Sequence, residues 1–142
     1  IGGKTDVVMM LNGALAGLVS ITAEPLAPSP LLSISIGAVG SLVMYFGTNW
    51  LNSLRLDDVV GAIPVHLFAG VWGTLAVTLS NSETILTTQI IGILSVTTFT
   101  FIFSYIVFFV LKKFIGLRIS NEAERLGTDV AEIGVRAYAI RD

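Results

Sequence analysis

The longest apolar segment of the sequence runs from residue 85 to residue 111 and contains no Asp, Glu, Lys, Arg or His. It is long enough to cross a bilayer as a tilted helix, because about 20 apolar residues suffice. Three further apolar segments lie at 7–23, 31–51 and 59–79, and short polar connections separate the four. Short connections join antiparallel neighbours. The sequence therefore predicts an all-α fold, a polytopic membrane helical bundle with four spans.

The composition favours the same class of protein. Mean hydropathy is +0.85 and only 13% of the residues are charged, whereas soluble domains carry about 25%. A net charge of −2 argues against a nucleic-acid partner, which requires a basic surface. The chain has no cysteine and one histidine, so it has neither thiolate ligands nor a multi-histidine metal centre of its own. We expect no cofactor and no enzymatic activity.

The basic residues all fall on one side of the predicted bundle. They are Lys4, Arg55, Lys112, Lys113, Arg118, Arg125, Arg136 and Arg141. The connections on the other side carry only Glu24 and Glu83. We expect a multi-pass plasma-membrane protein, and the positive-inside rule then predicts that both of its ends lie in the cytoplasm.

This topology divides the sequence into membrane helices within residues 1–115 and a cytoplasmic tail at 116–142. In the tail, Ser120 fits the cap of a short helix that Gly127 breaks.

The third apolar segment contains the single histidine, His66. An imidazole inside a membrane is costly unless it lines a cavity or finds a partner, so His66 is either a satisfied core side chain or part of a polar pathway. Pro64 leaves two helix starts open, one near residue 59 with a loosened turn and a preferred one near Ile63. Asp58, before this segment, fits a helix cap.

Several short motifs, in order along nearly the whole chain, resemble the C-terminal part of the ammonium transporter (Amt/Rh) family. They are Leu11-Asn12-Gly13-Ala14-Leu15-Ala16-Gly17, Ile36-Gly37-Ala38-Val39-Gly40, Asp57-Asp58 with Gly61-Ala62 and Val65-His66, Gly70-Val71-Trp72-Gly73-Thr74, Gly116-Leu117-Arg118, and Gly127-Thr128-Asp129-Val130-Ala131-Glu132 with Ala137-Tyr138. No single piece is diagnostic, but together they are specific.

The resemblance implies the last four of eleven membrane helices and the tail of one protomer in a homotrimer, with a pore inside each protomer. His66 matches a pore histidine that faces a second histidine from the missing N-terminal part. Asp58, Gly70 and Trp72 match positions near that pore with structural or coupling roles. Without the resemblance, the sequence is also consistent with Asp58 as a capping residue and Trp72 as a packing residue.

The tail motif carries a further implication of the resemblance. Gly127, Asp129, Glu132 and Tyr138 match a segment that docks beneath the neighbouring pore and couples the subunits. The alternative is an ordinary solvated tail. Implied partners besides ammonium, ammonia and the bilayer are a PII-type regulator or a fused signalling domain.

The function implied is that of an ammonium channel or transporter, with ammonium or ammonia passing an apolar pore and a histidine pair. A bare ammonium ion would lose its hydration at great cost there. A neutral imidazole has one donor and one acceptor nitrogen, so it can bind ammonia or relay a proton. Two alternatives of the same fold are an ammonium sensor that signals through a C-terminal extension and a conduction-dead homologue.

Overall fold

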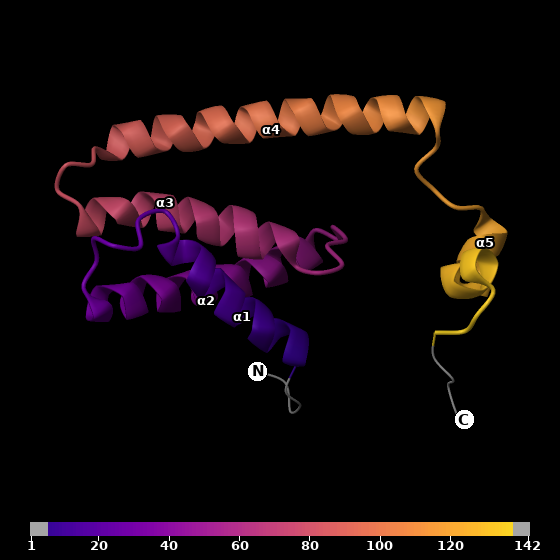
Figure 1. Cartoon of the computed structure of the whole chain (residues 1–142), viewed down its shortest axis with the longest axis horizontal. Helices are drawn as coiled ribbons and strands as arrows, with labels where there is room; N and C mark the ends of the chain where they lie inside the picture. Colours follow the sequence, from indigo (N-terminus) through magenta and orange to yellow (C-terminus); the bar gives the residue numbers. More distant parts are fainter. Residues whose placement is uncertain (1–5, 138–142) are drawn as a thin grey trace. The chain divides into compact units, whose positions relative to one another are not determined.

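The computed structural model of the protein describes residues 6–137, and every regular element in that range is helical (Figure 1). The elements are α1 (Val7–Ile21), α2 (Pro30–Ser53), the π-helix η1 (Ile63–Phe68), α3 (Ala69–Ser80), α4 (Leu86–Phe114), α5 (Asn121–Leu126) and the π-helix η2 (Asp129–Ile133). The chain divides between Thr97 and Thr98, within α4, into two compact units.

Three helical segments are long and apolar enough to cross a membrane: Pro30–Ser53, Ile63–Ser80 and Leu86–Phe114. The first predicted span is shorter, because α1 has 15 residues and rises about 1.5 Å per residue, against a hydrocarbon core of about 30 Å. It ends at Ile21 because the backbone N–H and the hydroxyl of Thr22 both donate to the carbonyl of Val19. Three of the four predicted segments therefore have the length of a span.

The helices of the first unit approach each other over small residues. Helices α1, α2 and α3 lie side by side (Figure 1). Ser20 of α1 is buried, and its hydroxyl donates to the carbonyls of Ala16 and Ala69 at 2.8 and 3.2 Å. A Cβ atom at Gly40 would meet the Ser20 side chain, and one at Gly73 would meet the Ser20 backbone. The bundle thus depends on backbone contact, as is usual for helices in lipid.

A small apolar core lies beside this contact. Its buried members are Ala16, Met44, Val65 and Ala69, and Met9 and Val19 pack against them. At one end of the unit, the side-chain amide of Asn81 donates to both carboxylate oxygens of Glu24 at 2.9 and 3.1 Å. This pair joins the loop after α1 to the loop after α3.

Helix α4 differs from the bundle in that none of its residues is buried. Its aromatic side chains stack along the helix, with ring centroids 5.9 Å apart for Phe99 and Phe103. In the second unit, the Ser120 hydroxyl accepts a hydrogen bond from the Ala123 N–H at 3.1 Å. Helix α5 therefore starts where the sequence predicts, and it stops at Gly127, whose φ of +93° is left-handed.

Candidate functional site

The segment that carries His66 starts at a cap formed by one carboxylate. Oδ1 of Asp58 accepts a hydrogen bond from the Ala62 N–H, and Oδ2 accepts one from the Ile63 N–H, both at 2.9 Å. The helical backbone begins at these residues, and Pro64 lies in its first turn. The preferred helix start is therefore correct, and the missing N–H of Pro64 costs little there.

The first six residues of this helix form a π-helix rather than an α-helix. The Ala69 N–H reaches back to the Pro64 carbonyl, five residues earlier. Such turns are rare and often occur at functional sites. Apolar packing holds it against α2, because a Cβ atom at Gly47 would meet the Phe68 ring, and that ring lies 5.8 Å from the Trp50 ring. The sequence did not predict this turn.

Neighbouring residues of η1 differ sharply in exposure. Pro64 and Val65 are buried, whereas His66 and Leu67 are exposed. Within residues 6–137 the imidazole has no hydrogen-bond partner, and it is not packed into the core that these residues form. The turn thus anchors itself through two side chains and presents the next two to open space.

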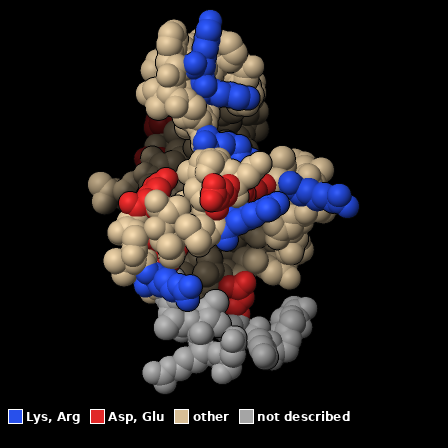
Figure 2. Space-filling view, turned by 90° about the vertical axis from the view of Figure 1, so that its right-hand side faces the viewer, with Lys and Arg blue, Asp and Glu red and all other residues tan. Residues whose placement is uncertain are grey.

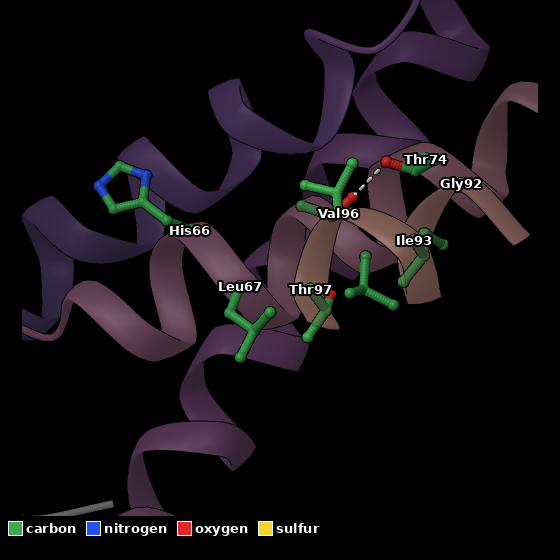
Figure 3. A pocket seen from close by; sticks show the side chains of 9 residues that line it. His66, Leu67, Thr74, Gly92, Ile93, Val96 and Thr97 are labelled. Atoms are coloured by element: carbon green, nitrogen blue, oxygen red, sulfur yellow. Dashed lines mark hydrogen bonds between the residues drawn. The ribbon is translucent and has the colours of Figure 1, made fainter. Parts of the chain in front are cut away.

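His66 lines two pockets of the first unit. The larger, of about 370 Å³, is bounded by η1 and α3 and by the first part of α4. Its lining residues are His66, Leu67, Gly70, Val71, Thr74, Gly92, Ile93, Val96 and Thr97. Figure 3 shows the imidazole at one end of it and the Thr74 hydroxyl bonded to the Gly70 carbonyl at 2.9 Å. Because this wall is largely apolar, the imidazole is its main group for acid–base chemistry.

The other residues singled out near His66 occupy different places. Gly70 lines the larger pocket one turn after His66, whereas Asp58 and Trp72 line neither pocket. The Trp72 indole N–H donates to the Ile36 carbonyl of α2 at 2.9 Å. Asp58 and Trp72 are thus bonded to backbone groups, as the capping and packing alternatives require.

Sequence reasoning missed the role of Asn12. Its side-chain amide donates to the Val60 carbonyl at 3.0 Å, and Asn12 lines the second pocket, of about 210 Å³, together with His66. The available signal was a carboxamide within an otherwise apolar segment, which needs a partner when it is buried. The sequence does not identify that partner, since it lies 48 residues away.

The tail residues form a compact turn in the second unit. Oδ2 of Asp129 accepts a hydrogen bond from the Ala137 N–H at 2.8 Å. This bond holds the pKa of Asp129 below its ordinary value of 3.8, although partial desolvation acts in the opposite direction. Glu132 is exposed within η2, and Gly134 ends that helix with a left-handed φ of +77°. Tyr138 lies outside the described residues.

The sequence matches one family of known proteins over almost its entire length. A sequence model described as the Ammonium Transporter Family matches residues 1–138. The chain belongs to this family. The match confirms the resemblance based on the short motifs and the prediction that the chain is not an enzyme.

Individual members of the family align with almost the whole of this chain. Ammonium transporter Amt2 of Archaeoglobus fulgidus is 38% identical over 156 aligned positions, and the alignment covers 96% of this chain and 33% of that protein. Ammonium transporter Amt1 of Haloferax mediterranei is 35% identical, with coverage of 96% and 27%. The ammonium transporter of Corynebacterium glutamicum is 32% identical, with coverage of 96% and 33%. The chain therefore spans about a third of the length of these curated relatives.

Proposed function

We propose that this chain supplies part of the conduction pathway of an ammonium channel or transporter, and that His66 lines that pathway. The observation that carries the proposal is the exposure of His66 on a π-helical turn whose preceding residues are buried. The wall around it is apolar, with Gly70 leaving room one turn along. Such a wall disfavours a hydrated cation, whereas an imidazole can accept a proton from ammonium or donate a hydrogen bond to ammonia.

The pathway requires walls that residues 6–137 do not provide. The larger pocket is bounded by η1, α3 and α4 alone, and the relatives are about three times as long as the aligned segment. We propose that the remaining part of the protein closes the pathway and brings a second histidine to His66. We further propose a homotrimer in which every protomer has its own pore.

The charge distribution supports an orientation in the plasma membrane. The loop containing Arg55 and the segment after Lys112 lie on the cytoplasmic side in this proposal, and Glu24 and Glu83 lie outside. Figure 2 shows basic and acidic side chains at the surface. Residues 116–142 then form a cytoplasmic tail.

We propose that this tail couples the subunits through Gly127, Asp129, Glu132 and Tyr138. The turn closed by Asp129 gives Asp129 and Glu132 a defined conformation, which a docking segment needs. A PII-type regulator or a fused signalling domain is the proposed tail partner.

The test is the ammonium-evoked current of the complete protein in proteoliposomes. We expect a saturable current that His66→Ala abolishes, because the substitution removes the donor and acceptor without changing a buried residue. Leu67→Ala is the matched control, since Leu67 is the exposed neighbour on the same turn, and it should keep most of the current. An unchanged, saturable and ammonium-selective current in His66→Ala would contradict the proposal.

The same preparation separates transport from sensing. Tight ammonium binding measured by calorimetry, without any current in the unmodified protein, would replace the transporter with an ammonium sensor of the same fold. Neither current nor binding would indicate a conduction-dead homologue.

A further inference from the structure

One side chain of α1 reaches the start of the π-helical segment. The Asn12 amide donates to the Val60 carbonyl at 3.0 Å, which joins positions 48 residues apart in the sequence. The next residue, Gly61, has a left-handed backbone with a φ of +72°. The hydrogen bond therefore holds the turn at the point where the chain changes direction into η1.

Asn12 and Gly61 also fit one another sterically. A Cβ atom at Gly61 would meet the Asn12 amide nitrogen, so only glycine leaves space for this contact. On the other side of the turn, the Asp58 carboxylate bonds the N–H groups of Ala62 and Ile63. Two polar side chains, one from α1 and one from the turn itself, thus fix the residues that begin η1.

The backbone connects this turn directly to His66. The Val65 N–H donates to the Gly61 carbonyl at 3.2 Å, and Val65 directly precedes His66. Asn12 and His66 also line the same pocket of about 210 Å³. A shift of the turn would therefore move both the wall of this pocket and the imidazole.

We propose that Asn12 is a positioning residue that sets the direction of the His66 imidazole by holding the turn at Val60 and Gly61. The inference rests on the proposed function, in which His66 lines the ammonium pathway. Asn12 acts through the backbone of the turn and not by contact with the ammonium.

The experiment uses the complete protein with Asn12→Leu, which removes the amide, and Asn12→Ser, whose shorter side chain does not reach the Val60 carbonyl. Asn49→Leu is the matched control, because the Asn49 amide donates to the Tyr45 carbonyl within α2 and leaves the turn untouched. Loss of one hydrogen bond of ordinary strength should lower the equilibrium constant for the native turn about fivefold. We expect a decrease of up to about fivefold in the saturable ammonium current for both Asn12 variants and less than about a twofold change for Asn49→Leu.

A second measurement distinguishes positioning from general stabilisation. The ¹⁵N resonances of His66, assigned by their loss in His66→Ala, should shift in both Asn12 variants and stay in place in Asn49→Leu.

Three outcomes decide whether Asn12 positions His66. A normal current in folded Asn12→Ser, or a reduced current with unshifted His66 resonances, would overturn the role of Asn12. A full current in His66→Ala would instead overturn the proposed pathway, and the resonances would still report whether Asn12 orients the imidazole. Shifted His66 resonances together with a reduced current in both Asn12 variants would support the proposal.

Discussion

The η1 segment and helix α4 are both apolar, yet they are held in different ways. In η1, Pro64 and Val65 are buried, and hydrogen bonds accepted by Asp58 and donated by Asn12 fix the turn before it. Helix α4 is almost five times as long, regular throughout, and has no buried residue. Hydropathy and length are enough to specify a regular apolar helix. A segment that must present one particular side chain requires partners from elsewhere in the chain.

The largest expected difference concerns two helical glycines. Gly73 of α3 abuts the Ser20 backbone, whereas Gly92 of α4 has no atom within 4 Å of the position of a Cβ atom. Gly73→Ala should destabilise the protein by about 1–3 kcal/mol through overpacking. Gly92→Ala should be neutral or stabilising by up to about 1 kcal/mol. Thermal unfolding in detergent measures both changes in stability. Equal unfolding midpoints for the two variants would contradict the difference in packing between the bundle and α4.

The cap of η1 provides the next largest effect. Asp58→Ala removes the acceptors of two backbone N–H groups, and loss of a helix cap costs about 1–2 kcal/mol. Asp57→Ala is the control, because the Asp57 side chain makes no hydrogen bond within residues 6–137. Thermal unfolding should show a lower midpoint for Asp58→Ala alone. The same midpoint in both variants would contradict a structural role for this carboxylate.

A smaller loss of stability is expected when the hydrogen bond between α3 and α2 is removed. Trp72→Phe keeps an aromatic ring but loses the indole bond to the Ile36 carbonyl, which is worth about 1 kcal/mol. Trp50→Phe should be milder, since Trp50 contacts Phe68 through its ring. Urea titration of the two variants gives the comparison, and a greater loss in Trp50→Phe would show that ring packing outweighs the hydrogen bond.

The smallest effect concerns pH and the tail. Because the pKa of Asp129 is lowered in the folded tail, its contribution to stability is present above its ordinary pKa of 3.8. That contribution is lost as the pH falls through the lower, folded pKa. The NMR signal of the Ala137 N–H should move with this titration, and Asp129→Asn should abolish the movement. A titration midpoint above 3.8 would mean that the Ala137 bond does not stabilise the carboxylate.

Much of the helical architecture could be predicted from the sequence. The uncharged run 85–111 became α4, and Ser120 and Gly127 bound α5 as expected. Pro64 was compatible with two helix starts, and the bonds to Asp58 decide between them. In each case the signal is local, because hydropathy, caps and glycine act within a few residues.

The π-helical turn and its long-range partners could not be predicted in this way. The contact of Gly47 with Phe68 and the bond from Asn12 to Val60 depend on how separate helices pack. The histidine itself was easy to find because it is unique in the sequence. Its exposure beside the buried Val65 follows only from the three-dimensional arrangement.

The central claim is that η1 presents His66, and not its neighbour Val65, to a pathway used by ammonium. Thiol labelling of the complete protein tests this directly, and the described segment has no cysteine of its own. After removal of any other thiols, His66→Cys and Val65→Cys would be exposed to methyl methanethiosulfonate with and without ammonium. We predict rapid labelling of His66→Cys, slowed by ammonium, and little labelling of Val65→Cys. Equal labelling of the two variants, unaffected by ammonium, would contradict it.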